Sequence, residues 1–267
     1  MNILFLGDIF GKPGRICVSK EISSLVNKHG VDIVIANGEN AAGGIGINPS
    51  IAGTLLNLGI DVLTSGNHIY KKKEIYDYIN NEPRLLKPAN FPPGTPGNGF
   101  YLFSNKKTGG KKIAVFNICG RVFVENLDCP FRTVDEILDI LHRETNIIIV
   151  DFHAEVTSEK MAMGWYLDGR VSAVVGTHTH VQTADERILP KGTAYISDVG
   201  MVGPRDSVIG VKKELIIERF IKMMPQKFTV ASDDNWVNGV LIDIDEETGL
   251  ALSIKRLNYR VEMNQGV

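Results

Sequence analysis

The chain has 267 residues, with 29 basic and 31 acidic side chains that give a formal net charge of -2. Its apolar share of 43% and its charged share of 22% are those of an ordinary globular protein. The near balance of charge argues against a broad basic surface, so we expect no extended nucleic acid as a partner. A chain of this length builds a large core, and without a repeat or a low-complexity tract we expect one domain over residues 1–267.

The cysteines and the apolar runs bear on the cell compartment. The chain has three cysteines, Cys17, Cys119 and Cys129, with neither an even count nor C-x-x-C spacing. A disulfide framework or a thiolate zinc site is therefore not expected, and we predict reduced, buried thiols. No signal-peptide pattern opens the chain, and no apolar stretch reaches the roughly 18 residues of a membrane span. We expect a cytoplasmic protein without a membrane partner.

Short apolar runs rich in isoleucine and valine alternate with segments of helical spacing. The runs predict strands buried on both faces, at residues 3–6, 31–36, 60–63, 113–118, 147–150, 171–175 and 240–244. Apolar residues at helical spacing predict helices within residues 16–26, 51–58 and 134–141. This alternation predicts a layered α/β fold. Residues 88–99, with four prolines and three glycines, are expected to be irregular, and residues 240–254 predict a β-hairpin with its turn at 245–249.

Side chains that bind metals follow several of these strands directly. Open α/β sheets bind their ligands at the carboxyl ends of the strands. The segments concerned are Gly7–Asp8, Asn37–Asn40, Thr64–His68, Asp151–Glu155 and Gly176–His180. Each alone has a structural explanation, such as a helix cap for Asp8, a turn for Asn40 or a hydrogen-bonded core histidine for His153. Their joint occurrence favours a metal site.

His178 and His180 give the strongest single signal. An i, i+2 pair on extended backbone directs both imidazoles to one side, where they can serve one metal centre. Gly176 permits a sharp turn just before them. With His68 and His153, four of the six histidines of the chain follow predicted strands.

Other motifs for phosphate or acyl chemistry are excluded. Residues 7–13 have three residues between the glycines where a P-loop needs four, and Pro13 stands where a hydroxyl residue would hold magnesium. Residues 43–46 lack the spacing of a dinucleotide-binding loop. The sequence has no G-x-S-x-G elbow, and its cysteines have no recognisable catalytic context. These observations argue against an NTPase, a dinucleotide enzyme and a serine or cysteine hydrolase.

The motifs at the strand ends resemble those of the calcineurin-like metallophosphoesterases. They are GD at 7–8, GEN at 38–40, GNH at 66–68, His153 and GTHTH at 176–180. Longer stretches are similar to the YmdB-type subgroup of that superfamily, namely MNILFLGDIFGKPGR, NGENAAGGIGI, TSGNHIY and GTHTHVQTADERIL. The resemblance runs along the whole chain. It implies a four-layer α/β/β/α sandwich and hydrolysis of phosphodiesters, including 2′,3′-cyclic nucleotides.

The resemblance also implies a ligand set for two divalent metal ions. One ion is expected on Asp8, Glu39, Asn40 and His180, and the other on Glu39, Asn67, His153 and His178, with Glu39 as the bridge. Phe10 stands where a histidine ligand is usual in the wider superfamily, and Glu39 replaces an aspartate. On the resemblance, the amide oxygen of Asn40 supplies the missing ligand. Nitrogen and oxygen ligands suit iron, manganese or zinc, and the resemblance favours iron or manganese.

The expected chemistry follows from this ligand set. A hydroxide that bridges the ions attacks phosphorus in line, and the ions stabilise charge on the phosphoryl oxygens. His68 remains after the ligands are assigned, so we assign it as the general acid for the departing oxygen or as a donor to the phosphate. The prediction is a binuclear phosphodiesterase acting on small phosphodiesters or nucleotides.

Other functions stay open at this point. Within the same chemistry, the alternatives are a phosphomonoesterase and an RNA-directed phosphoesterase. A different class is a regulatory factor that keeps the metal site and acts by binding a nucleotide or a protein. The resemblance also implies a homo-oligomer, but no apolar seam in the sequence identifies the interface.

Overall fold

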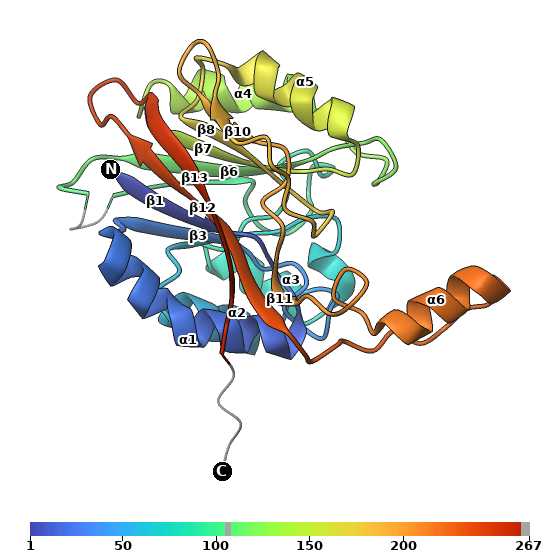
Figure 1. The fold of residues 1–267 in the computed structure, drawn as a ribbon. Coiled ribbons are helices and arrows are strands. Elements are labelled where there is room, and N and C mark those ends of the chain that lie inside the picture. The colour runs from blue at the N-terminus through green and yellow to red at the C-terminus, as the bar shows by residue number, and fades with distance from the viewer. Residues whose placement is uncertain (105–107, 263–267) are drawn as a thin grey trace.

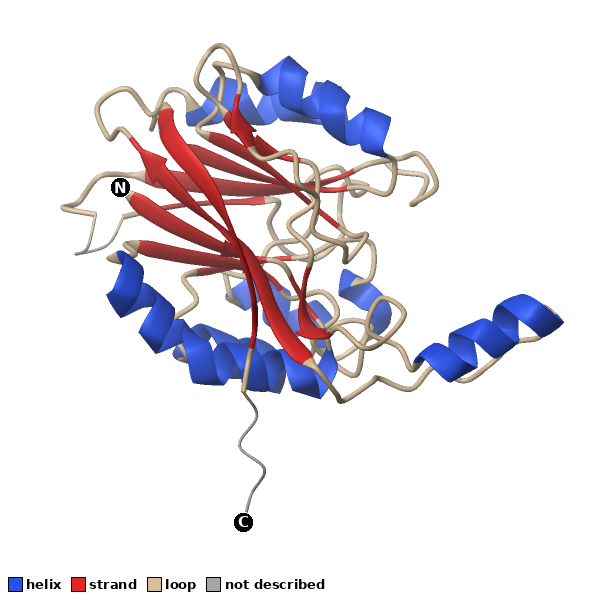
Figure 2. Ribbon diagram, viewed as in Figure 1, coloured by secondary structure: helices blue, strands red, loops and turns tan. Residues whose placement is uncertain are grey.

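Two β-sheets lie face to face and carry helices on their outer faces (Figures 1 and 2). The computed structural model describes residues 1–104 and 108–262. Within this part of the chain, no helix is long and apolar enough to cross a membrane. The layers follow one another as helix, sheet, sheet and helix, so the predicted four-layer α/β/β/α sandwich is confirmed.

The first sheet has seven strands in the order β2-β11-β12-β1-β3-β4, with β13 paired to β12. The strands are β1 (Asn2–Leu6), β2 (Asp8–Ile9), β3 (Ile33–Asn37), β4 (Val62–Thr64), β11 (Met201–Pro204), β12 (Asn235–Ile244) and β13 (Ala251–Arg260). β1, β3 and β4 are parallel neighbours, and β12 runs antiparallel to β1. The predicted hairpin is confirmed as β12 and β13, although both strands are longer than their apolar runs.

The second sheet has six strands in the order β5-β6-β7-β8-β10-β9. They are β5 (Phe100–Phe103), β6 (Ile113–Cys119), β7 (Ile148–His153), β8 (Ala173–Thr177), β9 (Arg187–Ile188) and β10 (Ala194–Ile196). The central strands β6, β7, β8 and β10 are parallel. Their carboxyl ends therefore meet at one edge of the sheet, which is where ligands bind in open α/β sheets.

The helices cover the outer faces. They are α1 (Gly11–His29), α2 (Pro49–Asn57), α3 (Ile75–Asn81), α4 (Pro130–Leu141), α5 (Thr157–Leu167) and α6 (Lys213–Lys222), with a short 3₁₀ helix at Ile69–Lys71. α1 and α2 pack on the first sheet, and α4 and α5 pack on the second. α6 projects away from the layers (Figure 1). The sequence predicts α1, α2 and α4 but not α3, α5 and α6.

A core of aliphatic side chains joins the two sheets. Ile3 and Phe5 of β1 and Ile35 of β3 meet Ile149 of β7 and Val175 of β8, and all of them are fully buried. Separate apolar clusters lie between each sheet and its helices. A strand with apolar clusters on both faces needs apolar side chains at every position, which explains the continuous runs in the sequence.

Local signals set the helix ends. α2 begins after Asn48, whose Oδ1 accepts a hydrogen bond of 2.9 Å from the backbone N–H of Ile51, with Pro49 in the first turn. α1 ends at Gly30, which has φ 58° in the left-handed region.

The thiols differ in burial. Cys17 and Cys119 are buried, and neither these two nor Cys129 is in a disulfide. Cys129 precedes Pro130 at the start of α4 and is only half-buried, so the expected burial is wrong for this residue.

Candidate metal centre

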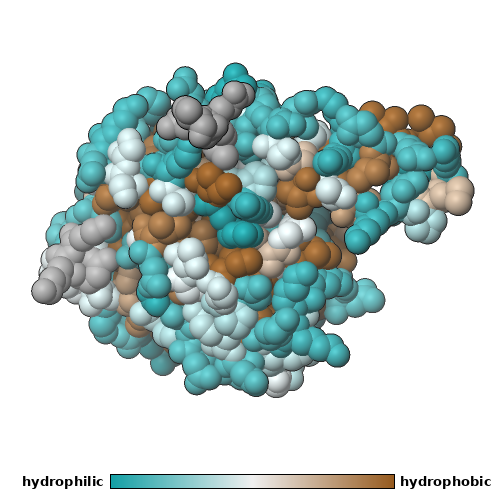
Figure 3. All heavy atoms as spheres, turned by 90° about the horizontal axis from the view of Figure 1, so that it is seen from below, coloured by the Kyte–Doolittle hydropathy of each residue, from teal (hydrophilic) through white to brown (hydrophobic). Residues whose placement is uncertain are grey.

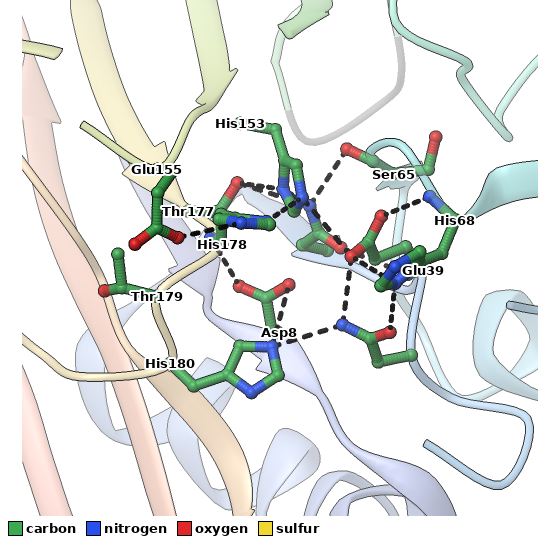
Figure 4. A network of polar contacts seen from close by, with 12 residues as sticks. Asp8, Glu39, Ser65, His68, His153, Glu155, Thr177, His178, Thr179 and His180 are labelled. Atoms are coloured by element: carbon green, nitrogen blue, oxygen red, sulfur yellow. Dashed lines mark hydrogen bonds and ion pairs between the residues drawn. The ribbon is translucent and has the colours of Figure 1, made fainter. Parts of the chain in front are cut away.

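Strand ends from both sheets bring the predicted site residues to one place (Figure 4). Asp8 follows β1, Glu39 follows β3 and His68 follows β4 in the first sheet. His153 ends β7, and His178 follows β8 in the second sheet. The cluster therefore lies at the junction of the two sheets, where their strand ends meet.

Glu39, His153 and His178 form the tightest part of the cluster. His153 Nε2 lies 2.9 Å from His178 Nδ1 and 3.3 Å from Glu39 Oε1. One ligand atom from each residue lies within 4.8 Å of the others, so the three can hold one metal ion. A Cβ at Gly66 would collide with His153 Nε2 and Glu39 Oε2, so only glycine permits the chain to pass this close.

Asp8 and His180 form a second group. Asp8 is fully buried; its Oδ2 accepts a hydrogen bond of 3.2 Å from the backbone N–H of His178. Asp8 Oδ1 has no hydrogen-bond partner within the described residues and lies 3.7 Å from His180 Nε2. A buried carboxylate oxygen without a donor is costly, and a cation would satisfy it.

Asn40 connects these two groups. Its Nδ2 donates a hydrogen bond of 3.0 Å to Glu39 Oε1 and lies 3.2 Å from His180 Nε2. Its Oδ1 faces His68 Nδ1 at 3.2 Å. The amide thus lies between the predicted ligands, with its nitrogen toward the centre. A ligand role for Oδ1 requires the amide to turn over, which exchanges its oxygen and nitrogen.

His68 and Asn67 differ in their relation to the cluster. The backbone N–H of His68 donates to Glu39 Oε2 at 3.1 Å, and its imidazole Nδ1 lies 3.4 Å from Glu39 Oε1. Asn67 makes no hydrogen bond to the cluster in the part of the chain that is described. Its Oδ1 is buried without a partner, and its side chain lines a separate hollow with Tyr70 and Phe91. The ligand role of Asn67 stays a prediction.

The backbone at the two histidines differs from what we expected. His178 has φ 106° and His180 has φ 65°, so neither lies on extended backbone. Both imidazoles nevertheless reach the cluster (Figure 4). Residues other than glycine seldom adopt positive φ, and strain of this kind is found at functional sites. The i, i+2 pattern correctly predicted that both imidazoles lie in one cluster, but the extended backbone that it assumed is wrong.

A buried relay orients His153. Its Nδ1 pairs with Thr177 Oγ1 at 2.9 Å, and the Thr177 hydroxyl donates to Asp151 Oδ1 at 2.6 Å. Asp151 also accepts from Thr64 Oγ1 at 2.5 Å and from Asn37 Nδ2 at 3.1 Å. This arrangement fixes the ring so that Nε2 faces the cluster, as outer-shell carboxylates do for metal-bound histidines. We did not predict it, because it joins residues from four strands.

A second buried pair fixes the segment that carries His178. Lys160 of α5 donates to Asp198 Oδ2 at 2.6 Å and to the backbone oxygen of Thr177 at 2.8 Å. Asp198 Oδ2 also accepts from the backbone N–H of Thr179 at 3.0 Å. The pair therefore holds the backbone on both sides of His178. We did not predict this contact either, because α5 carries no clear periodicity.

The electrostatics of the cluster reflect its burial. Burial raises the pKa of Asp8. For Glu39, burial acts in the same direction, but the adjacent His153 and His68 hold its pKa well below the usual value. Burial acts to lower the pKa of His153, yet Glu39 and Asp8 raise it to about 9. Burial and the neighbouring His153 lower the pKa of His178 to about 3. A buried set of this kind is typical of functional sites.

The predicted ligands therefore fit divalent metal ions. The set offers imidazole nitrogen and carboxylate and amide oxygen, and it includes the unpartnered Asp8 Oδ1. Phe10, which stands where a histidine ligand is usual, is buried and packs edge-to-face on the His180 ring with 5.3 Å between ring centroids. Phe10 thus supports a predicted ligand without being one.

A cleft of about 500 Å³ opens onto the cluster. Glu39, Asn40, His68, His178 and His180 lie on its polar side. Its apolar side includes Phe10, Ile209, Phe228 and Val230. Glu155 also lines it, and its Oε2 lies 3.0 Å from His178 Nε2. Glu155 lies in one of the candidate segments of the sequence, but it is not among the predicted ligands.

Known proteins share both the sequence and the fold. A family model described as YmdB-like protein matches residues 4–257. A relative from Bacillus subtilis, named 2′,3′-cyclic-nucleotide 2′-phosphodiesterase, is 52% identical over 257 residues, which are 96% of each chain. A hypothetical protein from Thermus thermophilus has a solved structure with a TM-score of 0.90 at 39% identity, covering 97% of this chain and 99% of that one. A novel phosphatase from Mycoplasma pneumoniae has a TM-score of 0.91 at 35% identity, covering 97% and 93%.

The match of the family model spans nearly the whole chain, and the relatives match over almost their full length. The sequence resemblance is thereby confirmed, and the chain belongs to the YmdB-like protein family.

Proposed function

We propose that this protein is a metal-dependent phosphodiesterase that hydrolyses small phosphodiesters, with 2′,3′-cyclic nucleotides as its substrates. The observation that carries the proposal is the cluster of Asp8, Glu39, His153, His178 and His180. The first three are buried, and the last two are half-buried and line an open cleft together with Glu39. The name of the Bacillus subtilis relative supports the choice of substrate.

Two divalent ions are proposed, of iron or manganese, with zinc as the other candidate. Asp8, Asn40 and His180 would hold one, His153, His178 and Asn67 the other, and Glu39 both. Bound there, the ions would act as Lewis acids on water and on the phosphoryl group. Asp8 and Glu39 are the only carboxylates of this set, so the loaded site keeps positive charge for a phosphate.

His68 is proposed to donate a proton to the departing oxygen. Its Nδ1 faces Asn40 Oδ1 and Glu39 Oε1, and its side chain lines the cleft. Because these contacts occupy Nδ1, Nε2 is the nitrogen left for the substrate, and it would carry the proton that passes to the departing oxygen. Backbone contact with Glu39 places this imidazole beside the predicted metal ligands without making it one of them.

The cleft favours a small substrate over RNA. Among the described residues that line it, none is lysine or arginine. Proteins that hold long nucleic acids neutralise several phosphates with such side chains. A short diester needs only the phosphate site and a wall for the rest of the molecule, and the apolar side of the cleft supplies that wall.

We also infer that the protein assembles with copies of itself through α6 and the segment after it. Phe220, Ile221 and Met223 are 72%, 76% and 82% exposed. Figure 3 shows hydrophobic side chains along the projecting arm. Glu214 and Lys222 lie toward opposite ends of α6, so two such helices pair favourably when they run antiparallel.

Substrate comparison on the metal-loaded protein tests the enzymatic proposal. After reloading with manganese or iron, we expect hydrolysis of 2′,3′-cyclic AMP and bis-para-nitrophenyl phosphate, and slower turnover of para-nitrophenyl phosphate and of an oligoribonucleotide. Glu39→Gln should abolish turnover, whereas Glu247→Gln, on the exposed β12–β13 turn, should not. If the monoester or the oligoribonucleotide is the better substrate, the proposed class is wrong. Absence of hydrolysis of either diester by the loaded protein would refute the enzymatic proposal itself.

A further inference from the structure

A second cavity of about 210 Å³ adjoins the metal centre. It shares His180 and Ile209 with the cleft, so the two hollows meet at a predicted metal ligand. Its volume is below the roughly 300–1,000 Å³ of pockets that enclose a whole drug-sized ligand, so it suits a single ring system. We call it the amide cavity, after Gln182, Asn238 and Asn258 in its wall.

A stacked pair forms part of this wall. The Arg205 guanidinium carbon lies 4.0 Å from the centroid of the Trp236 ring, and both residues line the amide cavity. Within the described chain, the guanidinium makes no hydrogen bond or ion pair, since the hydrogen bond that joins Arg205 to Asp234 comes from its backbone N–H. A flat cation held on an indole and free of acidic partners is a surface on which planar bases stack.

Hydrogen bonds within the protein fix the orientation of the Gln182 and Asn258 amides. Gln182 Nε2 donates to the backbone oxygens of Val199, Gly239 and Leu257 at 3.1–3.2 Å, which fixes its orientation. Its Oε1 then accepts from Asn258 Nδ2 at 3.0 Å, so Asn258 has its oxygen left over. The wall therefore contains acceptors in a defined orientation rather than freely rotating ones.

Two residues of this wall also have buried polar atoms without a hydrogen-bond partner among the described residues. Trp236 Nε1 and Asn238 Oδ1 are buried and have no hydrogen-bond partner in the described part of the protein. One is a donor and the other an acceptor, on side chains two residues apart in β12 and so on the same face of the sheet. Unmet buried polar groups are rare in folded proteins, and a ligand is one reason for them.

Backbone pairing places this wall next to the metal centre. The backbone N–H of Gly7 donates to the backbone oxygen of Asn238 at 3.0 Å, and Gly7 directly precedes Asp8. β12 therefore runs beside the strand that delivers Asp8. A ligand with its phosphate at Asp8 and His180 has the amide cavity as the adjoining space.

We infer that the amide cavity binds the base of the nucleotide whose phosphodiester is cleaved at the metal centre. The inference rests on the proposed function for the identity of the ligand. A second phosphate is disfavoured because the wall has a single permanent cation, Arg205. A purely apolar ligand is disfavoured because it would leave Asn238 Oδ1 and Trp236 Nε1 unpaired. A flat ring with donors and acceptors on its edge fits both the stacked pair and the amides.

Tryptophan fluorescence tests binding without metal or turnover. The chain has two tryptophans, and each lies beside an arginine: Trp236 of β12 beside Arg205, and Trp165 of α5 beside Arg187. In Trp165→Phe, only Trp236 reports, and we expect adenosine to change its emission saturably, whereas ribose 5-phosphate does not. In Trp236→Phe, adenosine should have no effect on the remaining signal. An unresponsive Trp236 up to the solubility limit of adenosine overturns the inference.

A pair of matched substrates tests the same point in catalysis. Ribose 2′,3′-cyclic phosphate differs from 2′,3′-cyclic AMP by lacking the base. In Arg205→Ala, we expect the ratio of kcat/KM for the nucleotide over the base-free diester to fall about tenfold, mainly through KM, since base stacking contributes about 1–3 kcal/mol. Trp165→Phe is the control and should leave the ratio unchanged. An unchanged ratio in Arg205→Ala overturns the inference.

The two proposals fail in different ways. If the parent protein hydrolyses neither diester but adenosine still changes Trp236 emission, the proposed phosphodiesterase is refuted and base binding is supported. If both diesters are hydrolysed but adenosine does not change the emission of Trp236, the proposed phosphodiesterase is supported and the amide cavity is not the base site.

Discussion

Asn40 Oδ1 and His68 Nδ1 lie 3.2 Å apart, and this contact ties a predicted metal ligand to the proposed proton donor. An amide oxygen accepts hydrogen bonds and does not donate them, so His68 carries a proton on Nδ1 while the two are paired. When the Asn40 amide turns over to offer Oδ1 to a metal ion, its Nδ2 faces Nδ1 instead, and the proton of the neutral imidazole then lies on Nε2. The tautomer of His68 is thus set by its neighbour, and the same neighbour touches Glu39 and His180. Metal binding and proton donation are therefore linked through one side chain.

The first prediction concerns His68. His68→Ala should lower kcat by about 10²–10⁴, the usual contribution of a positioned acid or base. Metal content, measured by mass spectrometry of the purified protein, should stay the same because the imidazole is not among the proposed ligands. His142→Ala, on the surface after α4, is the control and should be fully active. Loss of metal in His68→Ala would show that this residue is a ligand.

The second prediction concerns metal and stability. Manganese at about 100 times its dissociation constant should stabilise the protein by about 2.7 kcal/mol. For a chain of this size that corresponds to a rise in Tm of roughly 5–10 °C. The physical reason is that a cation relieves the unpartnered Asp8 Oδ1 and binds between His153 and His178. Differential scanning fluorimetry measures it, and Glu39→Gln should lose most of the rise. An equal rise in Glu39→Gln would place the ion elsewhere.

The third prediction concerns the relay behind His153. Thr177→Val removes the hydroxyl that joins His153 Nδ1 to Asp151, so metal affinity should fall about 10–100-fold. Thr177→Ser retains the hydroxyl and should restore most of the affinity. Competition with a coloured chelator measures both variants. Equal metal affinities in the two variants would mean that the Thr177 hydroxyl does not orient His153 for metal binding.

The fourth prediction concerns the thiols. Burial raises the pKa of Cys17 to about 12 and raises the pKa of Cys119 as well. The backbone N–H of Arg132 lowers the pKa of Cys129, which lies at the N-terminus of α4. Near neutral pH, iodoacetamide should therefore alkylate Cys129 first and the other two only after unfolding, because the thiolate is the nucleophile. Peptide mass spectrometry over a time course checks the order, and early labelling of Cys119 would contradict it.

The fifth prediction concerns assembly. Replacing Phe220 and Ile221 together by aspartate puts charge into the exposed face of α6 and should convert the assembly to monomers. Light scattering coupled to size exclusion measures the mass. Ile140 of α4 and Met161 of α5 are also exposed but lie away from α6, so their double replacement by aspartate is the matched control and should keep the parent mass. A monomeric parent protein would refute the inferred assembly.

The sequence predicted the parts of the fold that local patterns determine. Continuous apolar runs mark β1, β3 and β6 because both faces of these strands are buried. It did not predict β9 or β11, since a strand of two to four residues has no period to detect. β7 extends past its apolar run to His153. Its last polar side chains, Asp151 and His153, are buried because both form hydrogen bonds with Thr177.

The candidate site was predictable only in part. Residue type and position after strands were enough to expect that Asp8, Glu39, His153 and the two histidines after β8 lie close together, as they do. The contacts of Asp151 with Thr64 and of Lys160 with Asp198 join segments far apart in the chain, so no local pattern predicts them. The ligand roles of all the candidate residues, the proton-donor role of His68, the single domain over residues 1–267 and the cytoplasmic location stay predictions.

The hydrogen bond from the backbone N–H of Gly7 to the backbone oxygen of Asn238 fixes the distance between the metal centre and the amide cavity. It links the strand that delivers Asp8 to the strand that carries Trp236 and Asn238, so the span between the two sites is set by strand pairing and not by a loop. Changing that span requires a register shift, which would turn every side chain of β12 to the opposite face. Substitution of the amides, by contrast, leaves the spacing intact. For the proposed base site, this means that amide substitutions can change the preference among bases, while the distance between base and phosphate stays fixed by the sheet.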